Sequence, residues 1–285
     1  MSDSPRVTVV TNGNLFAARG LAPLLLRHRE RWRWQIFVTT GLRDPDRSAW
    51  SQVPALLRRW GPRLSLYRAA VVLAPRLLES LDGRPRTVTG LCRSLGLEVQ
   101  RPRNLNHPDP RRRIQDFQPD LLLSFSCPYR LGSAILELPR RGAVNVHTSL
   151  LPAFAGIGTY FHALAEGVSR TGVSIHAMEQ RLDAGPVLVR ESRPIAPGES
   201  AFGLFADLCG RAGRLLPPLL EQILEGEGPA GEAQDPSRRS YRGEPDARVV
   251  RDLRRRGHAL LRRDDLPGLL APLSIPEAPW RASAR

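Results

Sequence analysis

Leu121-Leu122-Leu123-Ser124-Phe125 is an almost continuously apolar stretch, and it indicates a strand that is buried on both faces. A second strand of this kind is predicted downstream, at Ala143-Val144-Asn145-Val146-His147. Strands that are apolar on both faces and alternate with helices are typical of a parallel sheet covered by helices on each side. The two stretches therefore predict an α/β fold.

The flanking sequence continues the alternation. Strands are predicted at residues 6–11, 34–40, 97–99, 171–178 and 186–195, and helices at residues 15–29, 87–95, 110–117 and 200–224. Residues 44–83 carry apolar side chains at helical spacing and are predicted to form a helical insertion. We expect a doubly wound, mostly parallel, Rossmann-like domain at residues 1–225. A short extension at residues 226–285 follows, with a linker and a basic helix at residues 246–256.

Polar side chains lie at or near the carboxyl ends of these strands, where open α/β sheets bind ligands. Asn145 and His147 end one strand, His176 lies within the next, and Asp183 follows it. Acyl transfer to an amine requires donors for an oxyanion, a proton carrier and a charge that sets the state of this carrier. Each side chain alone is more often a turn or packing residue, so the hypothesis depends on the combination.

Three motifs occur in a fixed order: Asn-x-His-x-Ser-Leu-Leu-Pro at residues 145–152, Thr-Gly-Val-Ser-Ile-His at residues 171–176 and Leu-Asp-Ala-Gly-Pro at residues 182–186. With them, residues 119–224 resemble the 10-formyltetrahydrofolate-dependent formyltransferases. This family includes glycinamide ribonucleotide transformylase, methionyl-tRNA formyltransferase, sugar-nucleotide amine formyltransferases and formyltetrahydrofolate deformylase. The resemblance implies formyl transfer from 10-formyltetrahydrofolate to an amine. It also implies catalytic roles for Asn145, His147 and Asp183, with His176 as a fourth candidate that is either catalytic or structural.

The resemblance further implies which residues bind the two substrates. The residues expected to line the folate pocket are Pro128, Tyr129, Arg130, Leu131, Glu179, Gln180, Arg181 and Leu182. Those expected to contact the acceptor are Asn12, Gly13, Thr148 and Ser149. Backbone amides and carbonyls suit the donor and acceptor edge of a pterin, so side-chain identity in the folate segments can vary.

Several differences between this sequence and those of the related enzymes bear on the identity of the acceptor. Asn12-Gly13-Asn14 matches the phosphate loop of the ribonucleotide enzyme only in part, and Phe154-Ala155-Gly156 stands where the tRNA enzyme has an Arg-Gly pair. We expect neither the C-terminal domain of the tRNA enzyme, for which too few residues follow the linker, nor the regulatory domain of the deformylase before residue 6. We therefore predict a small-molecule amine acceptor, such as an amino sugar nucleotide or a biosynthetic intermediate.

Other functions stay open. Methionyl-tRNA and glycinamide ribonucleotide are alternative acceptors, with tRNA disfavoured. Hydrolysis of the donor is a second possibility, either with water in place of the amine or with a triad of Ser149, His147 and Asp183. The Gly-x-Ser-x-Gly elbow of many serine hydrolases is missing. A binding protein without catalysis is a third, because a fold does not determine an activity.

Composition adds four expectations. The formal charge is +14, but all 42 basic residues are arginine, and this bias weakens the inference of a nucleic-acid partner. Three widely spaced cysteines and the lack of CxxC or HExxH motifs predict neither disulfides nor a metal. No signal peptide or membrane-spanning stretch is evident, which predicts a cytoplasmic protein. The oligomeric state is not indicated.

Overall fold

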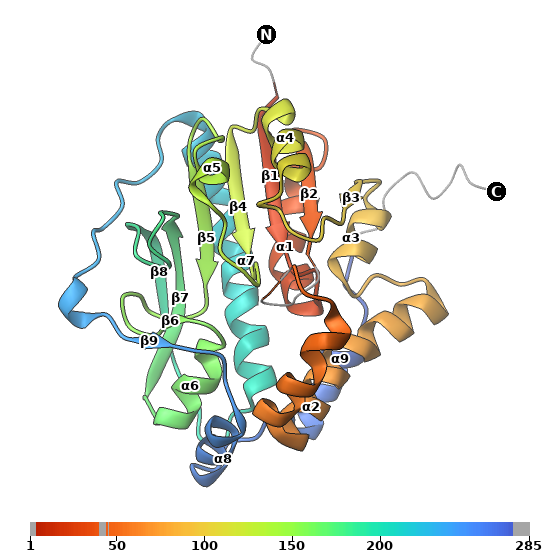
Figure 1. Cartoon of the computed structure of the whole chain (residues 1–285), viewed down its shortest axis with the longest axis vertical. Helices are drawn as coiled ribbons and strands as arrows, with labels where there is room; N and C mark the ends of the chain where they lie inside the picture. The colour runs from red at the N-terminus through yellow and green to blue at the C-terminus, as the bar shows by residue number, and fades with distance from the viewer. Residues whose placement is uncertain (1–3, 40–43, 45, 276–285) are drawn as a thin grey trace.

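The computed structural model describes residues 4–39, 44 and 46–275, and its centre is a seven-stranded sheet in the order β3-β2-β1-β4-β5-β7-β8. The strands are β1 (Arg6–Thr11), β2 (Arg33–Val38), β3 (Val99–Gln100), β4 (Leu121–Phe125), β5 (Ala143–His147), β7 (Arg170–Ala177) and β8 (Val187–Pro194). Strands β1 to β5 are parallel, whereas β7 and β8 are antiparallel to their neighbours (Figure 1). The predicted mostly parallel sheet is confirmed.

Helices cover both faces of this sheet. One face carries α1 (Leu15–His28), α3 (Val88–Ser94) and α7 (Ala201–Glu225), and the other carries α4 (Pro108–Phe117) and α5 (Ser133–Leu136) (Figure 1). Along β4, Leu121 and Leu123 join the core under α1 and α7, while Leu122 joins the core under α4 and α5. This burial on two sides is the reason why β4 is apolar throughout.

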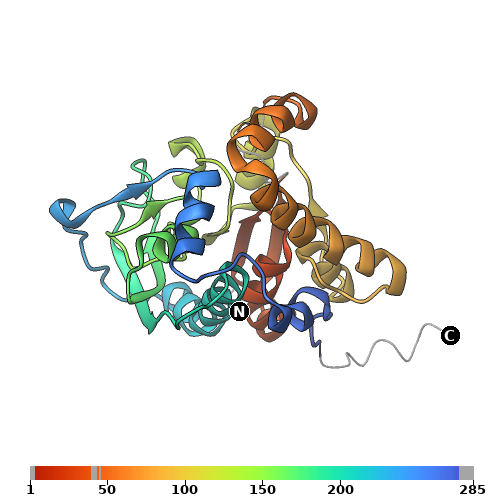
Figure 2. The ribbon, with the colours of Figure 1, turned by 90° about the horizontal axis from the view of Figure 1, so that it is seen from below.

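The predicted helical insertion is α2 (Ala49–Asp82), which is kinked at Gly61, where φ is 67°. Its inner side contributes Leu64, Tyr67 and Val71 to the core. Its outer side lies along the border of the molecule (Figure 2) and exposes leucines, of which Leu66 is 74% exposed. The Gly-Pro pair at residues 61–62 is a sequence signal for this kink.

The chain after α7 folds back onto the domain. It passes around the edge of the sheet at β8, and β9 (Tyr241–Arg242) then pairs in parallel with β6 (Ala155–Gly156) (Figure 1). Next, α8 (Ala247–Arg255) packs on α6 (Thr159–Glu166) with Val250 and Leu253 in the core. Two 3-10 turns and a short helix complete the segment: η1 (Pro236–Arg238), η2 (Arg263–Asp265) and α9 (Leu266–Leu270).

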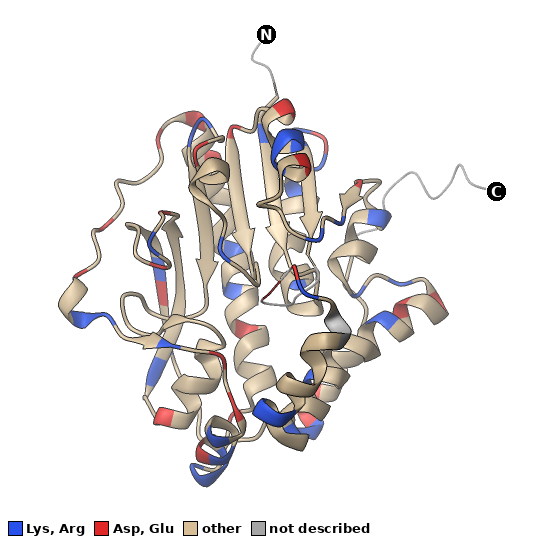
Figure 3. Ribbon diagram, in the orientation of Figure 1, with Lys and Arg blue, Asp and Glu red and all other residues tan. Residues whose placement is uncertain are grey.

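The described part of the C-terminal extension, residues 226–275, is thus packed against the domain. The residues expected to be a linker include Glu232, whose backbone pairs with Val187 at the start of β8. The predicted domain boundary at residue 225 stays a prediction. The arginines of α8 are exposed, and this helix lies at one end of the molecule (Figure 3). Of the helices within the described residues, none is long and apolar enough to cross a membrane.

Candidate active site

The four residues predicted to be catalytic come together at the carboxyl end of β5. Asn145 and His147 lie on β5, and the antiparallel strand β7 places His176 opposite Asn145. Asp183 belongs to the loop that joins β7 to β8. Its Oδ1 lies 3.8 Å from Nδ1 of His147 and 3.7 Å from Nε2 of His176. One carboxylate therefore lies between two imidazoles.

Hydrogen bonds determine the tautomer of His176. Its Nδ1 is 2.8 Å from the carbonyl oxygen of Ala177, which can only accept, so Nδ1 carries the proton. Nε2 is then an acceptor for the Asn145 amide nitrogen, at 3.1 Å. Burial, and secondarily the charge of His147, lowers the pKa of His176 to about 4, so the ring is neutral at physiological pH. This bond orients the amide and leaves its second N–H for another acceptor.

The His147 ring is held from its other side. Its Nε2 donates to the carbonyl oxygen of Phe154 at 2.8 Å, which leaves Nδ1 as the nitrogen that faces Asp183. The second carboxylate oxygen of Asp183 accepts from the backbone N–H of Gly156 at 2.8 Å. His147 is 6% exposed and Asp183 is 7% exposed, so the interaction between the two is little screened by solvent.

Two members of this network were not predicted from the sequence: the Phe154 carbonyl and the Gly156 amide. Both are backbone groups, and the side chains of Phe154, Ala155 and Gly156 carry no polar atom that could signal a role. The segment is held in place by its pairing with β9, in which Ala155 N donates to Ser240 O at 2.8 Å. Gly156 has φ 113°, and a Cβ there would collide with the carbonyl of Arg242, so only glycine fits.

The predicted acceptor residues lie near this edge, but their polar groups have partners within the protein. The buried Ser149 hydroxyl lies 3.0 Å from the Ala153 carbonyl and 3.1 Å from the Phe154 carbonyl. Thr148 Oγ1 lies 3.4 Å from Thr159 Oγ1. At the end of β1, Asn12 Oδ1 accepts from Asn14 N at 3.2 Å. These contacts shape loops, and a contact of these residues or of the buried Gly13 with an acceptor stays a prediction.

The first predicted folate segment follows β4, the neighbour of β5. Leu131 is 2% exposed and packs in the core, so its side chain has a structural role. The half-buried Tyr129 hydroxyl accepts from Leu105 N at 3.1 Å, and burial raises the pKa of Tyr129 to about 12. Arg130 is exposed, while its carbonyl accepts from Asn106 Nδ2 at 3.0 Å. Pro128 is half-buried.

The second predicted folate segment lies in the same loop as Asp183. Glu179, Gln180, Arg181 and Leu182 are all exposed, in contrast to the buried Asp183 that follows them. The two segments therefore emerge on either side of Asn145, one after β4 and the other after β7. Their binding of a folate stays a prediction, which this placement supports.

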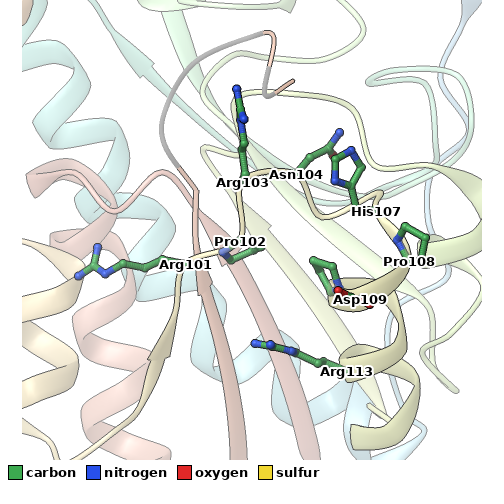
Figure 4. A pocket seen from close by; sticks show the side chains of 9 residues that line it. Arg101, Pro102, Arg103, Asn104, His107, Pro108, Asp109 and Arg113 are labelled. Carbon is green, nitrogen blue, oxygen red and sulfur yellow. The ribbon is translucent and has the colours of Figure 1, made fainter. Parts of the chain in front are cut away.

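Two cavities lie away from Asn145. The first, of about 450 Å³, is formed by residues 101–113 at the end of β3 and the start of α4, and Figure 4 shows Arg101, Arg103 and Arg113 around it. The second, of about 470 Å³, lies between Arg140, Met178 and Ile223 at the opposite end of β5. Neither of these cavities is lined by a residue predicted to be catalytic.

A protein-family model described as formyl transferase matches residues 83–217. These residues are a formyl transferase domain. The domain contains Asn145, His147, His176 and Asp183 together with both predicted folate segments. The family predicted from the sequence is thereby confirmed.

A curated protein that is similar in sequence to part of the chain is a methionyl-tRNA formyltransferase. The methionyl-tRNA formyltransferase of Myxococcus xanthus is 37% identical over 163 residues, which are 55% of this chain and 51% of that protein. The chain thus spans about half the length of this curated relative.

Solved structures of the same fold extend further along the chain. A sugar N-formyltransferase from Shewanella sp. FDAARGOS_354 has a TM-score of 0.58 at 14% identity and covers 89% of this chain and 88% of its own. Glycinamide ribonucleotide transformylase 1 from Symbiobacterium toebii has a TM-score of 0.56 at 19% identity, with coverage of 82% and 96%. An N-formyltransferase from Helicobacter canadensis, in complex with folinic acid and dTDP-3-aminofucose, has a TM-score of 0.59 at 13% identity, with coverage of 87% and 80%. These similarities confirm the fold.

Proposed function

We propose that this chain transfers a formyl group from 10-formyltetrahydrofolate to a primary amine of a small molecule. The observation that carries the proposal is the Asp183 carboxylate, held between His147 and His176 beside the Asn145 amide. This arrangement lies within the formyl transferase domain. The predicted cytoplasmic location of the reaction stays a prediction.

The chemistry of the surrounding segments fits a folate donor. A pterin offers an edge of hydrogen-bond donors and acceptors and two apolar faces, which backbone groups and apolar side chains can bind. The loop before Asp183 offers exposed backbone and the apolar side chain of Leu182, which is 37% exposed. The segment after β4 offers the half-buried Pro128 and Tyr129. When bound, the donor supplies a formyl group attached to a folate nitrogen.

Asn145 is the proposed donor to the developing oxyanion. Attack by the amine moves negative charge to the formyl oxygen, and an oriented N–H stabilises this charge. The His176 ring accepts one amide hydrogen of Asn145, so the amide cannot rotate freely and its other N–H keeps one direction. We assign His176 a positioning role on this ground.

Asp183 is the proposed proton carrier, and His147 is its proposed partner. A bond forms between the amine nitrogen and the formyl carbon, the bond from this carbon to the folate nitrogen breaks, and one proton moves from the amine to the folate nitrogen. The Asp183 carboxylate can accept this proton, directly or through water. With Nε2 bonded to Phe154 O, His147 presents Nδ1 to Asp183, and a protonated His147 would stabilise the charge of the carboxylate.

The proposal also names the chemical class of the acceptor. Solved structures of the same fold include sugar N-formyltransferases, and one of them is described with dTDP-3-aminofucose. This supports an amino sugar nucleotide or a similar small amine. The 37% identity to a methionyl-tRNA formyltransferase favours tRNA as the second candidate. The exposed arginines of α8 offer a surface that suits a phosphate backbone.

A binding and turnover experiment tests the proposal. Purified protein is titrated with 10-formyltetrahydrofolate by calorimetry and then incubated with the donor and one acceptor at a time, namely dTDP-amino sugars, simple primary amines and methionyl-tRNA. Release of tetrahydrofolate that depends on a small amine is expected. Release with methionyl-tRNA alone would favour the second candidate, and the absence of donor binding would contradict the proposal.

The triad form of hydrolysis has less support. The Ser149 hydroxyl shares its single hydrogen between the carbonyls of Ala153 and Phe154, and the His147 Nε2 donates to the same Phe154 carbonyl. A nucleophilic serine needs its hydroxyl to donate to the imidazole instead. Hydrolysis by water is distinguished from transfer by formate release in the absence of any amine.

A further inference from the structure

The segment that follows α7 contacts two parts of the candidate site, namely the loop that contains Asp183 and residues 154–156. Residues 231–242 form this segment, which we call the C-terminal strap. Its backbone pairs with Val187 through Glu232, by two hydrogen bonds of 2.8 Å, and with β6 through β9. Between these two attachments it passes the loop of residues 178–186, here called the Asp183 loop. The strap is therefore anchored on both sides of that loop.

Two strap side chains hold the backbone of the Asp183 loop. Gln234 Nε2 donates to the carbonyls of Asp183, at 3.1 Å, and Gly185, at 2.7 Å. Arg239 Nη2 donates to the carbonyl of Leu182 at 2.7 Å. The three carbonyls lie immediately around Asp183, so the strap restrains the backbone on each side of the carboxylate.

Asp183 needs such restraint because its backbone is in the left-handed region, at φ 50°. Residues other than glycine adopt this conformation rarely, and it persists where the surrounding structure imposes it. The orientation of the Gln234 amide is fixed as well, since a flipped amide would point its oxygen at two carbonyl oxygens. Its Oε1 is buried and has no hydrogen-bond partner among the described residues, so the amide is held by its N–H groups.

The strap also acts on the carboxylate end of Asp183. Ser240 Oγ accepts from Phe154 N at 2.9 Å, and Ser240 O accepts from Ala155 N at 2.8 Å. These bonds fix the segment whose next amide, that of Gly156, donates to Asp183 Oδ2. The backbone and the side chain of Asp183 are thus both held by groups that the strap positions.

We propose that Gln234 is a positioning residue for Asp183 and that Arg239 positions the adjoining part of the loop, at Leu182. The kinetic meaning of this assignment rests on the proposed function, in which Asp183 carries a proton and residues 179–182 bind the donor. Neither side chain touches a reacting atom. The side chains of Gln234 and Arg239 thus support the active site from outside residues 83–217.

Steady-state kinetics distinguish the role of Gln234 from that of Arg239. Gln234→Leu is expected to lower kcat by about 10–100-fold with little change in the KM for the donor, because a carboxylate displaced by about 1 Å loses catalysis on this scale. Arg239→Met is expected to raise the donor KM several-fold with a smaller effect on kcat. Glu232→Gln is the matched control in the same strap, because its side chain is 70% exposed and forms an ion pair with Arg190 rather than a bond to the Asp183 loop. It should match the wild type.

A double-mutant cycle tests the connection to Asp183. In the Asp183→Asn background, Gln234→Leu should cause little further loss of kcat, because a residue that acts through Asp183 has nothing left to position. Losses that multiply would mean that Gln234 acts independently of Asp183, and would overturn the assignment.

Hydrogen exchange provides a readout that does not depend on activity. In the Gln234→Leu and Arg239→Met proteins, the amides of residues 180–185 should exchange faster than in the wild type, while those of β4 and β5 stay protected. Exchange at the wild-type rate in both variants would overturn the proposal. If the wild type binds no donor but the loop still loosens in the variants, the strap assignment holds and the proposed function fails. If Gln234→Leu does not fold, the exchange rates of residues 180–185 in Arg239→Met alone test whether the strap restrains the loop.

Discussion

Asn145 and His176 lie opposite one another on β5 and β7, and the amide nitrogen of Asn145 is 3.1 Å from Nε2 of His176. Because Nδ1 of His176 donates to its own strand at Ala177 O, the ring offers only a lone pair to the amide. A neutral histidine therefore sets the direction of the N–H that we propose for the oxyanion. Four predictions follow from this arrangement and from its neighbours.

Substitutions at Asn145 and His176 should differ in a graded way. Asn145→Ala is expected to lower kcat by about 10²–10³-fold, the usual effect of losing one oxyanion donor. His176→Leu should lower kcat less, because the amide remains but is no longer oriented. His176→Gln, whose carbonyl oxygen can accept the same hydrogen bond, should recover much of this loss. Steady-state kinetics at saturating donor measure all three, and equal activity of His176→Leu and His176→Gln would contradict the positioning role.

The Asp183→Asn substitution separates charge from structure. The amide oxygen of an asparagine can still accept from Gly156 N, so the Tm should change little. The loss of a proton acceptor should lower kcat by about 10²–10⁴-fold. Thermal unfolding and turnover are measured on the same preparation. A variant with near-normal turnover would remove Asp183 from the proposed chemistry.

His176 should make the free energy of unfolding depend on pH. Its pKa is about 4 in the folded protein, against 6.5 in the unfolded chain, because burial disfavours the charged ring. Above pH 6.5 the ring is neutral in both states. Between pH 6.5 and about 4 only the unfolded state takes up the proton, so stability falls as the pH falls, by on the order of 3 kcal/mol in total.

Urea unfolding at several pH values between 4 and 7 checks this prediction. The His176→Gln protein lacks the titrating ring and should show a shallower loss of stability over the same range. His28 and His162 also have a lowered pKa through burial, and their contributions stay in both proteins. Identical pH dependence in the two proteins would show that His176 is not held neutral.

Ser149→Ala distinguishes a structural serine from a nucleophile. The hydroxyl bonds to two backbone carbonyls in a buried site, and its removal should lower the free energy of unfolding by about 1–3 kcal/mol because those carbonyls lose a partner. Turnover of the folded variant should stay within several-fold of the wild type. Loss of turnover without loss of stability would revive the triad hypothesis.

The sequence could predict the fold because the strands carry their own signal. Leu121 and Leu122 are buried against opposite layers of helices, and this requirement is visible as an unbroken apolar run. The candidate catalytic residues could be predicted because their polar side chains end such strands or follow them in a recognisable order. The strand order then places Asn145 and His147 on β5 beside His176 on β7.

The other parts of the candidate site could not be predicted, because their contacts leave no periodic pattern in the sequence. The Gly- and Pro-containing stretch that includes Gln234 indicates irregular structure but not where it packs. Its bonds to Asp183 and Gly185 join a side chain to backbone carbonyls about fifty residues earlier in the chain. The carbonyl of Phe154 and the N–H of Gly156 are also invisible in the sequence, because every residue has a backbone carbonyl and every residue except proline has a backbone N–H. Their roles come from the pairing of β6 with β9, which only the three-dimensional structure shows.

The most direct test of the central claim follows the formyl carbon itself. Donor labelled with ¹³C in the formyl group is incubated with the protein and a dTDP-amino sugar, and the label is located by NMR spectroscopy and mass spectrometry. We predict that the label appears as an N-formyl group on the amine, and that Asn145→Ala and Asp183→Asn reduce its formation in parallel. Label that appears as free formate at the same rate with and without the amine, or that stays on the donor with every amine tested, would contradict the account.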